Sequence, residues 1–433
     1  METVKVAVVG FGTIGSGAVK LLLQQPERIA RATGKKVELA YVVDKDLTRS
    51  RGVDVPKGKL VDDLNLVLND PEIHTVIELV GGIEPTRGIV LKLLENGKNV
   101  VTANKALLAH HGPELFAMAR KKGRSIAFEA AVGGGIPIIA AIGQSLTANR
   151  IECIHGILNG TSNFILTQME ELGTDYSASV AEAQRLGYAE ANPAMDVDGT
   201  DAAQKLAILS HLAFGATPDW RKIPRTGIDT VQTADIRCAN ELGYSIKLLA
   251  VAQLTDEGLE LHVSPTLTRH HTPLAEVRGA YNAVRVVGDA VGSVFFHGLG
   301  AGQMPTASAV IADLIDTIVG RAAITFKTLA LWDKDRSAPV PVRDPGKIAD
   351  RFYLRLSVQD RPGVLAEIAG VFGRHNISIA SVLQHEPAGL DDGFVPLVIM
   401  THSASAGALD DALKTIDSLP CAHPGTVRMR VRD

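Results

Sequence analysis

The chain has 433 residues, of which 46% are hydrophobic and 21% charged, and its formal net charge is -4. This length allows two or three domains with full cores, and the absence of a basic stripe argues against a nucleic-acid-binding protein. No charged leader and no uncharged apolar run of roughly 18 residues occurs, so neither secretion nor a membrane span is expected. Three distant cysteines, Cys153, Cys238 and Cys421, indicate neither a zinc site nor a disulfide framework, and they fit a cytoplasmic protein in a reducing cytosol.

A glycine-rich turn near the amino terminus is the first motif with a chemical meaning. Val4 to Val9 predict a buried strand, and the apolar spacing that follows residue 13 predicts a helix. Between them Gly10, Gly12 and Gly15 match G-x-G-x-x-G in the strand-turn-helix context of a dinucleotide site. The glycines allow the backbone to approach a pyrophosphate, which the amides at the helix start would bind.

The next predicted strand, VELAYVVDKD, ends at Asp44, where a carboxylate can accept hydrogen bonds from an adenosine ribose. Asp44 suggests NAD, whereas Lys45, Arg49 and Arg51 could hold the 2'-phosphate of NADP, so both cofactors stay open. The expected cofactor-binding residues are Gly10, Phe11, Gly12, Thr13, Ile14, Gly15, Asp44, Arg51, Thr102, Lys105 and Gly302.

Strands and helices alternate up to about residue 130. Further strands are expected at 75–82 and 99–109, with a helix that starts near Pro85 between them. This alternation predicts an α/β fold with a parallel, doubly wound sheet of the Rossmann type, where ligands gather beyond the carboxyl ends of the strands. The residues expected along that edge are Gly81, Thr102, Asn104 and Lys105. Lys105 could also be a solvated lysine at a helix start.

The pattern changes after residues 125–139. Three consecutive glycines at 133–135 predict a flexible turn, and the later segment IECIHGILNGTSNFILTQMEELG predicts a strand followed by a helix capped near Thr161 or Ser162. A helix that starts with Gly160 and Thr161 can bind a carboxylate or phosphate as readily as it caps itself, and both interpretations stay open.

Residues 187–205, GYAEANPAMDVDGTDAAQK, combine four acids with one lysine. An EF-hand loop beginning at Asp196 would need glycine at its sixth position and a carboxylate at its twelfth, and the segment has neither. The ordinary interpretation is a helix start, with Asp198 as a capping residue and Asp201 paired with Lys205 one turn later.

The same segment carries a specific resemblance. The residues Ala183, Gly187, Tyr188, Ala189, Asn192, Pro193, Asp196, Val197, Gly199, Asp201 and Lys205 are spaced as in the signature of homoserine dehydrogenases. The glycine fingerprint and the segments TANKALL, EAAVGGGIP, GILNGTSNFIL and GLGAGQMPTASAV are similar to that family in the same order. The resemblance covers about residues 4–330.

This resemblance implies the reversible reduction of L-aspartate 4-semialdehyde to L-homoserine by NADPH or NADH, in threonine, methionine and isoleucine biosynthesis. The substrate carries an ammonium, a carboxylate and an aldehyde, so its pocket needs negative charge, a carboxylate site and a proton donor. By resemblance, Lys205 is the catalytic acid/base, and Lys105 and Asp201 act beside it. The expected substrate-binding residues are Glu190, Asp196, Gly160 and Thr161.

A catalytic lysine has to be tuned. The pKa of a free lysine, about 10.4, makes it a poor acid at neutral pH, and burial or a second nearby cation lowers that pKa. We therefore expect Lys105 to face Lys205, and Asp201 to orient the Lys205 amine from one helical turn away.

The family also holds a monovalent cation, expected to be sodium, through one carboxylate and several backbone carbonyls. The matching positions are Glu129, Val132, Gly134 and Ile136. A helix expected over about Thr306 to Val319 would return to the nucleotide-binding domain. Gly302, just before it, would lie near the nicotinamide or serve as a plain helix cap.

The carboxyl-terminal part predicts a separate module. Residues 333–350 are rich in proline and charge and predict a linker. Residues 351–433 predict the order β-α-β-β-α-β, and the turn RPGVL with the segment HNISIASV resembles ACT domains, which sense amino acids and usually pair through their sheets. That resemblance implies L-threonine as an effector and a homodimer or homotetramer. Asn376 would contact the effector, or else be an ordinary turn asparagine at a helix end.

The predicted organisation is a Rossmann domain at 1–134 with a returning helix at about 303–330, a catalytic and dimerisation domain at 135–302, the linker, and an ACT domain at 351–433. Two other functions stay open, namely another amino-acid or semialdehyde dehydrogenase, and a non-catalytic amino-acid sensor on the same fold. The presence of Lys105, Asp201 and Lys205 argues against the sensor.

Overall fold

The computed structural model describes residues 1–329, 339–385 and 393–432. It separates into two compact units, each made of distant segments: Met1–Glu152 with Gln204–Lys222 and Asn282–Val340, and Cys153–Ala203 with Ile223–Tyr281 and Pro341–Asp433. The predicted linker at 333–350 falls partly on residues 330–338, which lie outside the described residues. Among the helices of the described residues, none is long and apolar enough to cross a membrane.

The first unit is built on a parallel sheet of six strands in the order β3-β2-β1-β4-β5-β6. The strands are β1 (Thr3–Val9), β2 (Lys36–Val43), β3 (Leu60–Val61), β4 (Ile73–Glu78), β5 (Asn99–Thr102) and β6 (Ile126–Ala127). The order steps outward from β1 in both directions, which confirms the doubly wound α/β fold predicted from the alternation. The strand expected at 99–109 ends at Thr102, because Asn104 caps a helix there.

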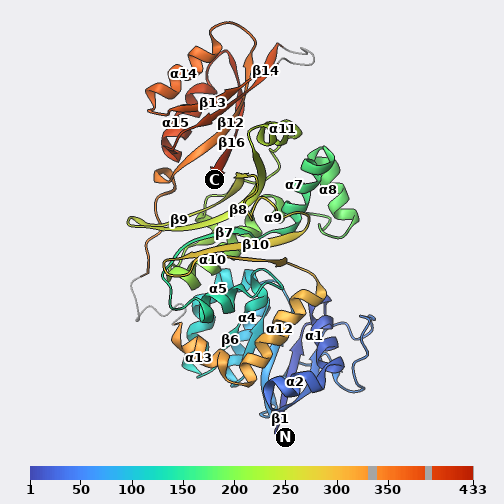
Figure 1. The fold of residues 1–433 in the computed structure, drawn as a ribbon. Coiled ribbons are helices and arrows are strands. Elements are labelled where there is room, and N and C mark those ends of the chain that lie inside the picture. The colour runs from blue at the N-terminus through green and yellow to red at the C-terminus, as the bar shows by residue number, and fades with distance from the viewer. Residues whose placement is uncertain (330–338, 386–392, 433) are drawn as a thin grey trace. The chain divides into compact units, whose positions relative to one another are not determined.

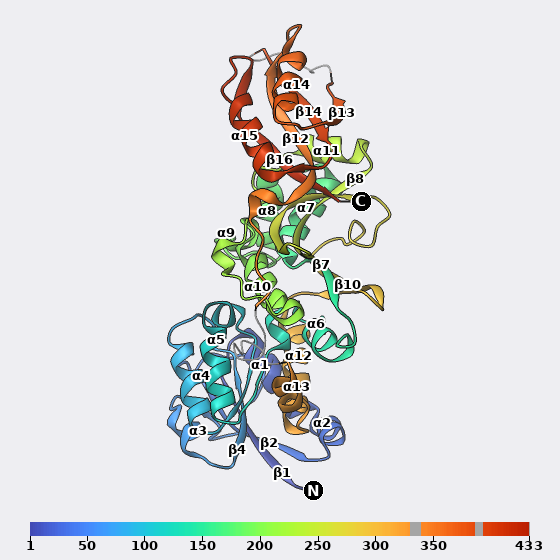
Figure 2. The same ribbon diagram turned by 90° about the vertical axis from the view of Figure 1, so that its left-hand side faces the viewer.

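Helices cover both faces of this sheet, with α3, α4 and α5 on one face and α1, α2 and α12 on the other (Figure 2). The helices of the unit are α1 (Thr13–Gln24), α2 (Pro26–Thr33), α3 (Asn65–Asn69), α4 (Thr86–Glu95), α5 (Lys105–Lys121), α6 (Ile138–Ala140), α12 (Gln303–Ile318) and α13 (Arg321–Thr328). Most of α10 (Thr200–Phe214) and the strands β10 (Tyr281–Gly288) and β11 (Gly292–Leu299) also belong to it.

Helix α12 comes from far along the chain and packs on α1 (Figure 1). The Gln303 side chain donates to the Ser16 hydroxyl over 2.9 Å. Gly17 allows this approach, because a Cβ there would lie 3.0 Å from the Ala307 Cβ. Val310 of α12 is fully buried in the same core as Val6 of β1. The amino-terminal sheet therefore depends on a helix from the carboxyl-terminal half for part of its core.

The second unit combines helices with a mixed sheet, whose strands follow the order β7-β8-β9-β16-β12-β14-β13, while β15 pairs with β12. The strands are β7 (Ile151–Ile157), β8 (Tyr244–Thr255), β9 (Gly258–Arg269), β12 (Ala349–Gln359), β13 (Ile379–Leu383), β14 (Phe394–Thr401), β15 (Ala404–Ser405) and β16 (Ala422–Arg432). The helices are α7 (Gly160–Leu172), α8 (Tyr176–Arg185), α9 (Ala194–Val197), α11 (Thr233–Glu241), α14 (Val364–Arg374) and α15 (Ala406–Ile416).

The start of α7 corrects one sequence prediction. The helix begins at Gly160, and its N-cap is Asn159, whose side-chain oxygen accepts from the Ser162 amide over 2.8 Å. The cap predicted near Thr161 or Ser162 was therefore wrong, because an asparagine just before the first helical residue reaches the amide of the third.

The carboxyl-terminal module has the predicted β-α-β-β-α-β order, in β12, α14, β13, β14, α15 and β16. Figure 2 shows α14 and α15 beside these strands. Phe352 of β12, Ile368 of α14, Leu397 of β14 and Leu409 of α15 are buried together in one core. The module thus has the hydrophobic core of an independent α/β fold.

Strand β16 joins the strands of the carboxyl-terminal module to β9 within one sheet. It pairs antiparallel with β12 inside the module, and its last residues, Arg430 to Arg432, pair parallel with Thr266 to Thr268 of β9. The module is therefore joined to the preceding part of the unit by backbone hydrogen bonds as well as by the connecting chain.

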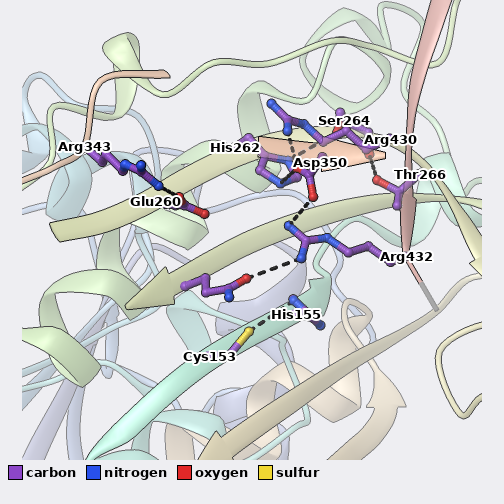
Figure 3. Close-up of polar contacts among 11 residues, drawn as sticks. Cys153, His155, Glu260, His262, Ser264, Thr266, Arg343, Asp350, Arg430 and Arg432 are labelled. Carbon is purple, nitrogen blue, oxygen red and sulfur yellow. Dashed lines mark hydrogen bonds and ion pairs between the residues drawn. The ribbon is translucent and has the colours of Figure 1, made fainter. Parts of the chain in front are cut away.

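Buried charges lie beside this pairing (Figure 3). The Asp350 carboxylate accepts from the guanidinium groups of Arg430 and Arg432, the latter with 2.9 Å between Nη2 and Oδ1. The His262 Nε2 lies 3.9 Å from the same carboxylate, and burial, then the two arginines, hold the pKa of His262 well below its ordinary value. A buried charge is costly unless it is paired, so these contacts fix β12 and β16 against β9.

A second buried acid ties the module to α11. Asp235 is fully buried and accepts from the Tyr353 hydroxyl over 2.9 Å and from the Arg355 Nε over 2.7 Å. Its other oxygen accepts from the Gln232 amide at the start of α11. Two buried carboxylates therefore hold β12 in place: Asp350 pairs with arginines of β16, and Asp235 joins β12 to α11.

Candidate active site

The glycine turn between β1 and α1 has the shape that a dinucleotide needs. A Cβ at Gly10 would lie 2.4 Å from the Leu79 carbonyl carbon, and one at Gly15 would lie 2.0 Å from the Gly10 oxygen. A Cβ at Gly12 would meet nothing within 4 Å, so the turn is open at that position. Gly12 is the N-cap of α1 and offers no side-chain acceptor, which leaves the first-turn amides for an anion. The turn therefore fits a pyrophosphate.

Asp44 lies beyond the end of β2 and is tied to the glycine turn. Its Oδ2 accepts from the Phe11 amide over 2.6 Å, and its Oδ1 lies 3.3 Å from the Arg51 Nη2. The Arg51 guanidinium carbon stands 4.9 Å from the centre of the Phe11 ring, in a cation-π contact. Asp44 thus holds both the turn and an arginine.

A cleft of about 340 Å³ opens beside this arginine. Its lining residues are Phe11, Arg49, Ser50, Arg51, Val53, Asp54, Val55, Pro56, Lys57, Gly58 and Leu60. Three of these side chains carry positive charge, so the cleft suits a phosphate-bearing group. Lys45 is exposed and does not contribute to the lining.

The carboxyl edge of β4 and β5 is organised by an acid that sequence reasoning missed. Glu78 is fully buried, accepts from the Thr102 hydroxyl over 2.6 Å and from the Val80 amide over 2.8 Å, and burial raises its pKa. The sequence feature that could have pointed to Glu78 is its place as a single acid within the apolar segment TVIELVGG. The Thr102 hydroxyl in turn accepts from the Asn104 amide over 3.0 Å, just before α5 begins at half-buried Lys105.

The acid-rich segment is gathered by one side chain from α7. The Asn159 Nδ2 donates to the Asp196 Oδ1 over 2.8 Å and to the Asp201 Oδ2 over 2.9 Å. Asp198 instead accepts from the Thr200 amide over 2.7 Å, at the first residue of α10, as expected of a residue that supports a helix start. Asn159 was missed as a site residue, although an asparagine before a Gly-Thr-Ser helix start was visible in the sequence.

The remaining substrate candidates separate into two groups. The Ser162 hydroxyl donates to the Asp196 carbonyl over 2.8 Å, and the Thr161 hydroxyl donates to the Tyr188 carbonyl over 2.6 Å, so the start of α7 lies against the acid-rich segment. Glu190 is exposed between α8 and α9, and its carbonyl accepts from Gln184 over 3.2 Å. The structure therefore brings Gly160, Thr161 and Asp196 together and leaves the Glu190 carboxylate on the surface of the segment.

Lys205 lies on α10, four residues after Asp201. Both side chains are buried, with 8% of Lys205 and 3% of Asp201 exposed. A lysine with so little exposure departs from the solvated i,i+4 pair of an ordinary helix surface. Lys105 belongs to the same compact unit as Lys205.

Glu129 is a buried acid with several donors. Its two carboxylate oxygens accept from the amides of Ile139 and Ala140 over 2.8 and 2.7 Å, and its own amide donates to the Asp313 carboxylate over 2.8 Å. Burial raises the pKa of Glu129 to about 7 and also raises that of Asp313. Both acids line a cavity of about 240 Å³.

The four positions matched to a monovalent cation offer oxygen atoms only, which suits a hard cation. Of these oxygens, the Ile136 carbonyl already accepts from the Ile138 amide over 2.8 Å, and Glu129 supplies the single charge. In the part of the chain that is described, no three His, Cys, Asp or Glu side chains gather as a metal site would need.

Two further candidates keep both of their interpretations. Gly302 has a φ of +118° and is the N-cap of α12 without a side-chain acceptor. Asn376 has a φ of +57° and is exposed between α14 and β13, as a turn asparagine would be.

Comparisons with known proteins agree along the whole chain. The family described as "Homoserine dehydrogenase" matches residues 137–315, "Homoserine dehydrogenase, NAD binding domain" matches 10–129, and "ACT domain" matches 352–421. The homoserine dehydrogenase of Pseudomonas aeruginosa is 43% identical over 439 residues, which cover 100% of this chain and 99% of that protein. The chain belongs to the homoserine dehydrogenase family.

Solved homoserine dehydrogenases share the fold. The structure from Thiobacillus denitrificans has a TM-score of 0.92 and 41% identity, covering 100% of this chain and 99% of that one. A hyperthermophilic archaeal homoserine dehydrogenase in complex with NADPH has a TM-score of 0.62 and 25% identity, covering 73% of this chain and 97% of that one. The chain is thus an NAD(P)-binding dehydrogenase with a carboxyl-terminal ACT domain, which favours the enzyme over the alternatives left open by the sequence.

We expect Glu129→Gln to remove part of the pH dependence of folding. Because the pKa of about 7 exceeds the ordinary 4.5, the folded chain binds this proton more tightly than the unfolded chain between those values. The free energy of unfolding of the native chain therefore falls as the pH rises from about 4.5 to about 7, by roughly 3 kcal/mol at about 1.4 kcal/mol per pKa unit. Urea titrations at about pH 5 and about pH 8 measure this fall.

Glu95→Gln, at an exposed acid of α4, is the matched control and should keep the native pH dependence. A smaller fall should remain in Glu129→Gln, because the raised pKa of Asp313 acts in the same direction. If the free energy of unfolding of Glu129→Gln fell between the two pH values by as much as that of the native chain, Glu129 would not hold a proton in the folded chain.

Proposed function

We propose that this chain reduces L-aspartate 4-semialdehyde reversibly to L-homoserine in the cytoplasm, with Lys205 as the proton donor and NADPH as the preferred cofactor. The observation that carries this proposal is the buried Lys205, one helical turn after buried Asp201, within the segment that bears the family's spacing. Lysine is rarely fully buried unless it is paired. Lys98 and Lys247 are buried as well, but Lys205 is the buried lysine that lies in that segment.

Lys205 supplies the proton in the direction of reduction. When bound, the reduced nicotinamide supplies a hydride to the aldehyde carbon. The Lys205 ammonium gives a proton to the aldehyde oxygen, which becomes the hydroxyl of homoserine, and in the reverse direction the neutral amine takes that proton back. Asp201 orients the amine, and the second ammonium at Lys105 favours release of the proton.

The charged ends of the substrate are assigned to α7 and α9. The carboxylate of Asp196, with Glu190 nearby in sequence, receives the substrate ammonium. The amides of Gly160 and Thr161, in the first turn of α7, receive the substrate carboxylate, as helix starts do for anions. The Ser162 amide donates a hydrogen bond to the Asn159 side chain, so this turn is held in place before substrate arrives.

We expect Lys205→Ala to lower kcat by roughly a hundredfold to ten-thousandfold, the usual effect of losing a placed acid. The dissociation constant for NADPH should stay within about twofold, because Lys205 is assigned to the reacting oxygen and not to the nucleotide. Steady-state kinetics and a fluorescence titration with NADPH measure the two quantities. Lys222→Ala, at an exposed lysine of the same unit, is the control. Substantial turnover by folded Lys205→Ala would sink the assignment.

NADPH is proposed over NADH on the chemistry beside Asp44. The Asp44 carboxylate is already engaged by the Phe11 amide and by Arg51, so it is less available to a ribose diol. Arg49, Arg51 and Lys57 place positive charge on the adjacent cleft, which suits a 2'-phosphate. The archaeal relative in complex with NADPH adds support from the family.

We expect Arg49→Gln to raise the KM for NADPH by about tenfold, because one charge contact with the phosphate is lost. The KM for NADH should change by less than about twofold, since NADH has no 2'-phosphate. Lys45→Gln is the matched control, because Lys45 is exposed and outside the lining of the cleft. Equal changes in both KM values would place the phosphate elsewhere.

A monovalent cation, sodium, is proposed to bind through the Glu129 carboxylate and the carbonyls of Val132, Gly134 and Ile136. The buried, partly neutral acid supports this proposal, since a cation would relieve the cost of its ionised form. Glu129→Gln is the variant that removes the charge from this site.

L-Threonine is proposed as an inhibitor that binds the ACT domain, with Asn376 as a contact, in a homodimer or homotetramer. Strand β13 supports pairing between copies, because it is the outer strand of the order and leaves Val382 exposed. The shared strand β16 and the Asp350 contacts support a link from this domain to β9. An effector shifts an enzyme only by binding its conformational states unequally. Because β16 pairs with β9, a change of conformation in the ACT domain would also change the position of β9.

We expect L-threonine to inhibit the full chain and to lose its effect on a shortened chain that ends at Lys334. Shortening also removes β16 from the edge of β9, so Asn376→Ala in the full chain is the matched variant and should raise the inhibitory threonine concentration by at least about tenfold. Initial rates over a threonine series measure both. Inhibition of the shortened chain at the same threonine concentrations would place the effector in the catalytic pocket.

A further inference from the structure

The Asn159 side chain makes hydrogen bonds to three partners, using both of its N-H donors and its oxygen. Its Nδ2 donates to Asp196 over 2.8 Å and to Asp201 over 2.9 Å, while its Oδ1 accepts from the Ser162 amide over 2.8 Å. Only 5% of the residue is exposed. A flipped amide would set its oxygen against two carboxylates and its NH2 against an N-H, so the partners determine its orientation.

The three partners come from separate helices. Ser162 lies in α7, which begins directly after Asn159 in the chain, while Asp196 lies 37 residues after Asn159 in α9 and Asp201 lies 42 residues after it in α10. Two carboxylates drawn to one point repel each other, and a shared donor offsets that repulsion. An amide does so without charge, whereas a lysine or arginine would neutralise the negative field that a substrate ammonium needs.

We propose that Asn159 is a positioning residue for the reaction. Its amide holds the Asp196 carboxylate toward the substrate ammonium and the Asp201 carboxylate toward Lys205, so that binding and proton transfer depend on one side chain that touches neither reacting atom. This inference rests on the proposed function, which gives Asp196 and Asp201 those roles.

A purely structural role for Asn159 would be that of a helix cap. A cap needs only an acceptor for the Ser162 amide, which serine or aspartate supplies as well as asparagine. The contacts to Asp196 and Asp201 need two N-H donors on one planar group, which neither serine nor aspartate has. Substitutions can therefore keep the cap and remove the positioning.

The experiment compares Asn159→Ser and Asn159→Asp in the full chain. Both should fold, with thermal midpoints close to the native value and an unchanged dissociation constant for NADPH. We expect kcat to fall by roughly tenfold to a hundredfold and the KM for L-homoserine to rise by roughly tenfold, as expected when two placed groups lose their orientation.

The pH profile separates the two variants. Asn159→Asp sets a third carboxylate against two others, which raises carboxyl pKa values, so the acidic limb of its kcat/KM profile should move to higher pH. Asn159→Ser adds no charge, and its acidic limb should stay near that of the native chain. An acidic limb that stays native in Asn159→Asp would argue against a part for these carboxylates in the reaction.

Asp175→Ala provides the matched control. Asp175 caps the neighbouring helix α8 by accepting from the Ala178 amide over 2.8 Å, so its loss removes a cap of the same kind. Its kcat, its KM and its pH profile should remain native. Native kinetics in Asn159→Ser and Asn159→Asp would overturn the inference, and so would failure of both to fold, because Asn159 would then be structural.

The proposed function fails by a different result. Turnover by Lys205→Ala would remove the catalytic assignment whatever the Asn159 variants do. An inactive Lys205→Ala together with a fully active Asn159→Ser would leave the proposed function in place and exclude the positioning role alone.

Discussion

Two hydrogen bonds from the Asn159 amide hold the acid-rich segment in its folded form. Without them, the two negative carboxylates of Asp196 and Asp201, at the starts of two helices, would repel each other at close range. The amide also caps α7 through Ser162, so the same side chain fixes the helix whose first turn faces these acids. The chemistry assigned to this segment depends on that arrangement, because a carboxylate acts on an ammonium only at short range in water.

Acids elsewhere in the chain fall into two groups by the kind of donor that meets them. In the first unit, Glu78 is met by a hydroxyl and an amide and Glu129 by two amides, and burial raises the pKa of both. At the carboxyl-terminal module, Asp235 and Asp350 are met by arginines. Neutral donors leave an acid able to take a proton or attract a cation, whereas a guanidinium partner commits it to a structural ion pair. Asp44, which meets both an amide and Arg51, combines the two modes.

The carboxyl-terminal module is more than an appended domain. It has its own core, yet its last strand continues the sheet that contains β7, β8 and β9. An arrangement of this kind resists independent rotation of the module, because rotation would break the backbone pairing of Arg430 to Arg432 and expose Asp350. A conformational change in the module would therefore be transmitted to β9 through the backbone pairing with β16.

Features that depend on near neighbours were determined by the sequence alone. The glycine turn, the alternation that gives a parallel sheet, the helix through Asp201 and Lys205, and the order of the last six elements all follow from spacing within a few residues. The family spacing in residues 183–205 also lies within one short segment, which is why the enzyme class could be predicted.

The tertiary structure decided which groups meet. Glu78 contacts Thr102 across 24 residues, Asn159 contacts Asp201 across 42, and Arg430 of β16 pairs with Thr266 of β9. The same limit explains the misplaced cap of α7, since Asn159 and Ser162 compete for that role until the folded backbone selects one. Spacing along the chain records the period of a helix or strand, but the partner of a buried polar group is chosen by how distant segments pack, and a single sequence carries no direct record of that choice.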